Sequence, residues 1–210
     1  MRRSIDLADD KRVKDAVCLA VAAATLLIPS RGRAQEAPPS PSEKWQFFQE
    51  ETVTPFVLLA SGITAGVSEA TRSDPQYGVG GIPLAKRFGA ATADNVTQNF
   101  FSDYLMASML HEDTRYRRKG EGHRFWARFG YAVSRALVTR TDSDEKTFNW
   151  SNLLGCGMQA GLSNAYYPRP SRNVSATAIN WANSIAGSGF GNLFPEFLPD
   201  FKRLLKRLHL

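Results

Sequence analysis

The chain has 210 residues, with 26 basic and 20 acidic side chains, a net charge of +6, and two cysteines, Cys18 and Cys156. This length suits one domain with a core of its own. Residues 1–34 carry seven basic and four acidic residues, so their removal would leave a charge of +3 and Cys156 alone. These values argue against a disulfide-stabilised scaffold and against a nucleic-acid partner.

The N-terminus has the features of a secretion signal. Basic residues between Arg2 and Lys14 precede an apolar run, Ala16 to Ile28, that only Thr25 interrupts. Gly32 to Ala34 then offers a small-x-small cleavage site. We expect residues 1–34 to be a cleaved signal peptide and the protein to be exported to the periplasm or cell envelope. The alternative is an uncleaved anchor, although this run is shorter than the roughly 20 residues of a spanning helix.

The rest of the chain is expected to be a linker followed by a helical domain. Residues 35–50 begin with a Pro- and Ser-rich stretch, which is typical of a flexible linker. Residues 51–210 show helical periodicity and no convincing strand, which predicts an all-α, compact bundle of five or six helices. The expected helices are residues 53–70, 83–112, 123–139, 148–167, 174–193 and 199–208.

Two long stretches of this domain have no charged side chain. They run from Thr147 to Pro168 and from Asn173 to Pro195, and each is long enough to cross a bilayer. Both contain several asparagines, which are costly in lipid. The stretches therefore predict either membrane-inserting helices or buried helices of a soluble bundle.

Small residues recur every four positions in the expected helices. The rows allow neighbouring backbones to approach closely, so we expect them to form helix contacts. The residues assigned this role are Gly62, Gly66, Gly157, Gly161, Ala178 and Ala182. If Gly161 lies in such a contact, Gly161→Leu should lower thermal stability.

Polar residues cluster between the second and third expected helices. His111 and Asp113 are candidate acid–base groups, and Arg115 is a candidate anion ligand. Alternatively, the cluster only caps and pairs a helix end. The third helix carries an arginine stripe suited to anions such as lipid headgroups, or simply to solvent: Arg124, Arg128 and Arg135. No metal-binding spacing and no cofactor motif is predicted.

Five short motifs resemble those of a group of uncharacterised exported bacterial proteins. They are Lys86–Gly89, His111–Tyr116, Tyr131–Arg135, Phe148–Ser151 and Asn164–Pro168. The resemblance covers about residues 75–200. It implies bacterial origin and export, and it transfers no catalytic residue.

Two functions are compatible with these features. The first is a non-enzymatic cell-envelope protein that packs on or in a membrane. The alternative is an envelope hydrolase acting on an anionic lipid or cell-wall substrate. In that enzyme His111 would be the base, Asp113 would orient it, and Arg115 with Arg135 would bind the anion.

Overall fold

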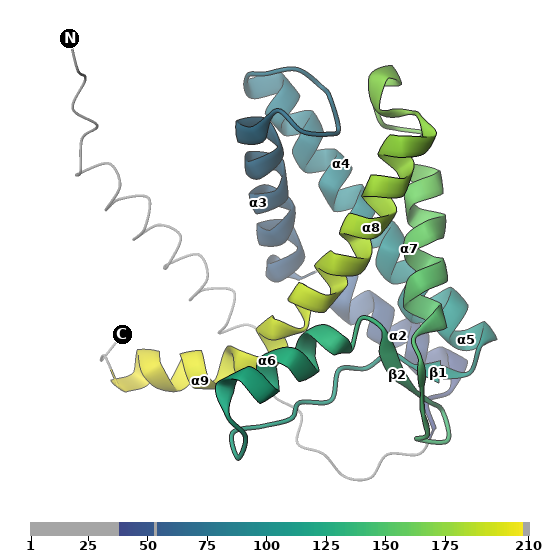
Figure 1. The fold of residues 1–210 in the computed structure, drawn as a ribbon, viewed down its shortest axis with the longest axis vertical. Coiled ribbons are helices and arrows are strands. Elements are labelled where there is room, and N and C mark those ends of the chain that lie inside the picture. Colours follow the sequence, from purple (N-terminus) through teal and green to yellow (C-terminus); the bar gives the residue numbers. More distant parts are fainter. Residues whose placement is uncertain (1–37, 53, 208–210) are drawn as a thin grey trace.

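The computed structural model describes residues 38–52 and 54–207, so the predicted signal peptide lies outside the described residues. The described chain is a mostly helical bundle, which confirms the predicted all-α class (Figure 1). Its helices are α2 (Pro41–Thr52), α3 (Pro55–Thr71), α4 (Gly81–Asn99), α5 (Ala107–Met109), α6 (Phe125–Ser134), α7 (Trp150–Ser163), α8 (Val174–Gly191) and α9 (Leu193–Arg207).

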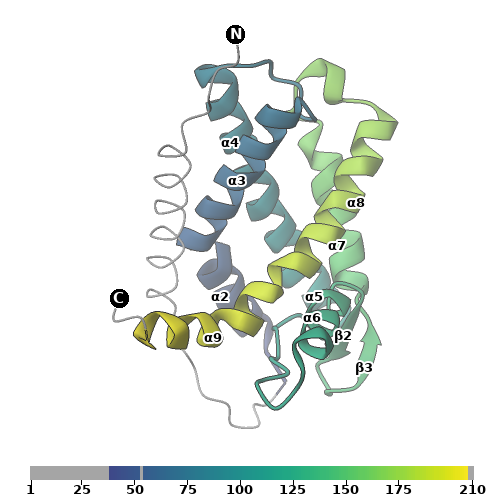
Figure 2. The same ribbon diagram turned by 60° about the vertical axis from the view of Figure 1, so that its left-hand side comes forward.

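The bundle has two parts. Helices α3, α4, α7 and α8 run lengthwise and form one part, which we call the upper bundle (Figures 1 and 2). Helices α6 and α9 lie across its lower end, together with a small sheet and the 114–122 loop. We call this second part the lower layer.

Helix α2 contradicts the predicted linker over residues 41–50. Pro41 occupies the first turn, where its missing N–H costs nothing. The Ser40 amide donates to the Glu43 carboxylate at 2.7 Å, and the Glu43 amide donates to the Ser40 hydroxyl at 3.3 Å. This reciprocal cap starts the helix. The Lys44 ammonium then donates to the Ala107 carbonyl at 2.9 Å, which fastens α2 to the domain.

The second expected helix is interrupted by a change of helical type. After α4, residues Phe100–Met106 adopt a π-helical conformation, and α5 follows. A π segment widens the backbone locally and is frequent at functional or tightly packed positions. Here it faces α7, as described below.

A three-stranded antiparallel sheet corrects the prediction that the domain lacks strands. It pairs β1 (Glu112–Asp113), β2 (Val138–Thr141) and β3 (Lys146–Phe148), in that order. Thr139 pairs with Thr147 across β2 and β3. The β-branched residues of β2 favour a strand over the last turn of the expected 123–139 helix, which therefore ends at Ser134.

The predicted small-residue contacts are wrong at most of their positions. Gly66, Gly161, Ala178 and Ala182 are exposed. A Cβ on Gly62 would lie 4.0 Å from Phe88 of α4, and a Cβ on Gly157 would lie 3.4 Å from Trp181 of α8, so these two positions do face a neighbouring helix. A Cβ on Gly161 would meet no atom of the described residues within 4 Å, so the helix contact on which the expected destabilisation by Gly161→Leu depended is absent.

The true close approach on α7 lies at Gly155, which the predicted rows did not include. A Cβ there would lie 2.6 Å from the Ser102 Cα and amide nitrogen in the π segment. Only glycine fits against this backbone. A four-residue period cannot identify the buried face, because two residues of shift turn a helix by about 200°.

Candidate functional site

The predicted acid–base pair does not form. His111 has a left-handed backbone, its side chain is 83 % exposed, and its Nδ1 lies 3.8 Å from an Asp142 oxygen. Asp113 is buried and accepts from Arg115 Nε at 2.8 Å and from Arg117 at 3.0 Å. Burial opposes ionisation of Asp113, but the two arginines outweigh it and lower the pKa. The Asp113 carboxylate is therefore occupied by its ion pairs with Arg115 and Arg117, and it does not orient the His111 imidazole.

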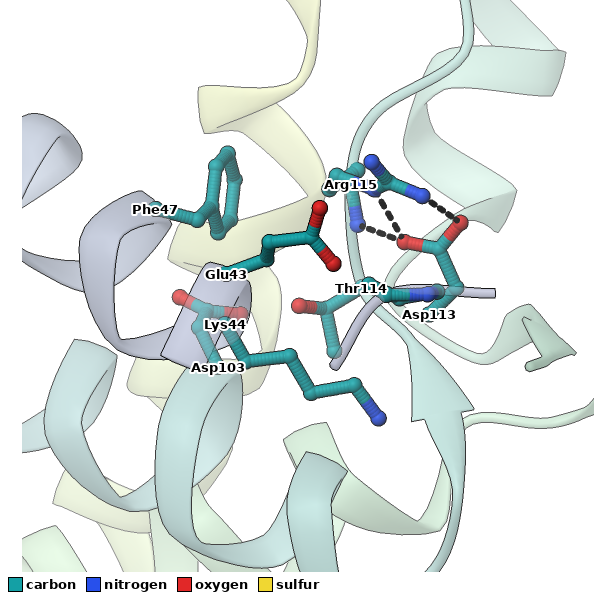
Figure 3. A pocket seen from close by; sticks show the side chains of 8 residues that line it. Glu43, Lys44, Phe47, Asp103, Asp113, Thr114 and Arg115 are labelled. Atoms are coloured by element: carbon teal, nitrogen blue, oxygen red, sulfur yellow. Dashed lines mark hydrogen bonds and ion pairs between the residues drawn. The ribbon is translucent and has the colours of Figure 1, made fainter. Parts of the chain in front are cut away.

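The pocket beside Asp113 is too small for a substrate. Its volume is about 20 Å³, which holds one water molecule. Figure 3 shows Arg115 turned back onto Asp113, with Glu43 and Asp103 on the side of α2 and the π segment. Burial raises the pKa of Asp103 to about 7, against a hydrogen bond with Thr114 that lowers it. This pocket is a junction between α2 and β1 at which the buried charges of Lys44 and Asp113 lie beside the exposed Glu43.

Most of the predicted anion-binding arginines are also committed to the fold. Arg128 is buried and pairs with Glu196 at 2.8 Å and with Asp200 at 2.7 Å. Arg135 is buried and donates to the Thr139 hydroxyl at 3.3 Å. The anion-binding assignment is therefore wrong for Arg128 and Arg135, whereas Arg124 is exposed at the start of α6.

Glu196 organises the lower layer, and the sequence analysis missed it. Its side chain is fully buried. It accepts from Arg128 Nε at 2.8 Å, the Tyr116 hydroxyl at 2.9 Å and the Lys119 amide at 2.9 Å. Burial opposes ionisation, but these donors lower the pKa of Glu196. The signal in the sequence was an isolated carboxylate directly after the uncharged 173–195 stretch.

A polar network lies inside the upper bundle, among small buried apolar residues such as Ala90 and Ala160. The Asp94 carboxylate accepts from the hydroxyls of Tyr166 and Tyr167, both at 2.6 Å, and from the Gln159 amide at 2.5 Å. Burial raises the pKa of Asp94, and this effect outweighs the three hydrogen bonds, which lower the pKa. Gln159 is fully buried, and its carbonyl oxygen accepts from Ser184 at 2.9 Å. The network ties α4, α7 and α8 together.

The exterior of the upper bundle is apolar. On α7 the buried residues are small or polar, whereas the large apolar side chains Leu154, Met158 and Leu162 are exposed. On α3 this inversion is partial: Ser61 is fully buried and Ile63 is 55 % exposed, but the apolar Val57 is buried as well. Further exposed apolar side chains on these helices and α8 include Leu58, Val67, Val174 and Ile179.

The described residues contain neither a metal-binding cluster nor a single helix suited to spanning a membrane. Within residues 38–52 and 54–207, no group of three or more His, Cys, Asp or Glu side chains is placed to hold a metal ion. In the same residues no single helix is long and apolar enough to cross a membrane, although the bent pair α2 and α3 passes by length and composition. No protein-family model, curated protein or solved structure matches the chain.

Proposed function

We propose that this protein is an exported, non-enzymatic cell-envelope protein whose upper bundle associates with a membrane through its apolar exterior. One observation carries the proposal: α7 buries only small or polar residues, and both α7 and α3 expose several large apolar side chains. A helix folded for water alone buries its apolar face. Exposed apolar surface of this kind is typical of contact with lipid or with a partner.

The helix lengths favour shallow embedding over a full crossing. Helix α7 has 14 residues and α8 has 18, which correspond to about 21 and 27 Å. A bilayer core is about 30 Å thick. The amphipathic α9 carries Lys202 and Lys206, which supply cations of the kind that bind anionic headgroups.

Flotation with lipid vesicles tests the proposal. The purified full chain should float with phosphatidylglycerol vesicles after a high-salt wash, because apolar contacts survive screening. The double variant Ile63→Asp, Val67→Asp should float poorly, whereas the matched control Ile63→Leu, Val67→Leu should float like the wild type. A chain that stays in the buffer with every vesicle, or that covers α3 by self-association, would contradict membrane association.

Fractionation of the producing cells tests the export part. The chain should be recovered with the envelope membranes after a salt wash. Recovery entirely in the soluble fraction would contradict the proposal.

A further inference from the structure

A groove of about 630 Å³ runs between α7 and α8 on the apolar exterior. Its walls include Gly157 and Ala160 from α7 and Ala178 and Trp181 from α8. The Trp181 indole donates to the Leu153 carbonyl at 2.9 Å and lies 3.4 Å from where a Cβ on Gly157 would be. Small residues that were expected to bring the helices together instead leave this hollow, and Trp181 forms part of its wall beside Gly157.

One end of the groove is cationic. Arg172 lines it beside Asn164, and its Nε donates to the Tyr167 carbonyl at 2.6 Å. Among the residues that the structure describes, no carboxylate pairs with Arg172, so its charge is not neutralised there. The groove therefore combines apolar walls with one cationic side chain at its end. An anionic amphiphile could place its apolar chain along these walls and its charged group at Arg172.

We propose that this groove binds an anionic phospholipid, with an acyl chain along α7 and α8 and the phosphate at Arg172. The proposal deepens the proposed membrane association and rests on it for the source of the lipid. Seven residues separate Gly157 from Asn164, so the channel is about 10 Å long. This length accommodates a short segment of a chain, and the volume lies within the usual range of ligand sites.

Binding of short-chain phospholipids below their micelle concentration tests the groove in the absence of a bilayer. The probes are dihexanoyl phosphatidylglycerol and dihexanoyl phosphatidylcholine, added to the ¹⁵N-labelled full chain. The readout is the indole N–H resonance of Trp181, assigned from its loss in Trp181→Phe. Phosphatidylglycerol should shift this resonance saturably, and phosphatidylcholine should bind more weakly.

Three variants separate the parts of the site. Arg172→Gln should weaken phosphatidylglycerol binding about fivefold, and Arg169→Gln, which changes a neighbouring exposed arginine outside the groove, should not. Ala178→Phe fills the groove from an exposed position and should abolish binding of both lipids. If Arg172→Gln proves unstable on melting, Ala178→Phe carries the test.

Equal affinity for both lipids, or wild-type binding by Ala178→Phe, would overturn the groove proposal. Neither result would contradict the proposed membrane association, which vesicle flotation tests separately. Conversely, a chain that binds the monomeric lipid but does not float would show that the membrane proposal fails and the groove does not.

Discussion

The upper bundle and the lower layer both bury polar groups, but they neutralise them differently. In the upper bundle, two hydroxyls and an amide surround the Asp94 carboxylate, and an ion pair between the buried Arg87 and Glu69 also joins α4 to α3 at 3.0 Å. In the lower layer, full charges meet, with Glu196 against Arg128 and Asp113 against Arg115. Ion pairs therefore dominate the buried polar contacts of the lower layer, whereas hydroxyl and amide donors surround the central carboxylate of the upper bundle, whose exterior carries large apolar side chains. Four predictions test this contrast, from the largest expected effect to the smallest.

Removing the central carboxylate should damage the lower layer most. Glu196→Ala leaves Arg128 with the Asp200 carboxylate and the backbone carbonyl of residue 196, and it removes the carboxylate that accepts from the Lys119 amide and the Tyr116 hydroxyl. We expect a loss of about 3 kcal/mol of unfolding free energy, measured by urea denaturation.

The matched control is Glu121→Ala, whose exposed pair with Arg203 should be worth less than about 1 kcal/mol. Because the pKa of Glu196 is lowered in the fold, its contribution should be present above the ordinary glutamate pKa and lost as the pH falls through the folded value. Equal losses for both variants would remove the contrast between buried and surface pairs.

A single methyl group should distinguish two glycines of α7. Gly155→Ala forces a Cβ into the Ser102 backbone and should cost about 1–3 kcal/mol. Gly161→Ala enters open space and should gain up to about 1 kcal/mol from helix propensity. Melting temperatures of the two variants give the comparison. Equal melting temperatures would show that the π segment does not press on Gly155.

The pH dependence of stability should change when Asp103 is neutralised. Its folded pKa, about 7, lies above the ordinary value, so folding disfavours the ionised form. The wild type should lose stability as the pH rises from about 4 to 7, because the buried carboxylate must ionise.

Asp103→Asn should remove that loss and be more stable than the wild type at pH 8, by at least about 1 kcal/mol, with a smaller difference near pH 5. Urea midpoints at the two pH values test this. A constant difference across pH would show that Asp103 does not titrate in this range.

The smallest effect concerns the apolar exterior. Ile63→Ser should change stability in buffer by less than about 0.5 kcal/mol, because Ile63 is already exposed. Ser61→Ile, two residues earlier and fully buried, should cost about 1–3 kcal/mol through overpacking. If Ile63→Ser lowered the free energy of unfolding more than Ser61→Ile did, α3 would have to pack its apolar face inward.

Helix positions were largely predictable from the sequence, and the faces they bury were not. Apolar periodicity and proline or glycine boundaries predicted α3, α7 and α8 to within a few residues, and they predicted the start of α4 but not its end at Asn99. Helix α2 was missed because proline and serine were interpreted as a linker, although Ser40 and Glu43 form a capping box.

The candidate site depended more strongly on the tertiary structure. His111 and Asp113 are near in sequence, but Asp113 is buried among arginines while His111 points outward, so proximity along the chain was no guide to chemistry. Glu196 meets the 114–122 loop across about 80 residues of chain, a contact that no local pattern encodes.

By itself, the sequence determined a helical domain with charge-free helices rich in small residues, because helix propensity and charge spacing are local properties. Only the tertiary structure decided that Gly155 touches the π segment while Gly161 does not, that Gly157 and Ala178 line a groove, and that the apolar rows face outward. These choices depend on how each helix is rotated about its axis. That rotation is set by all the neighbours of a helix together, including the π turn that displaces the backbone at Ser102.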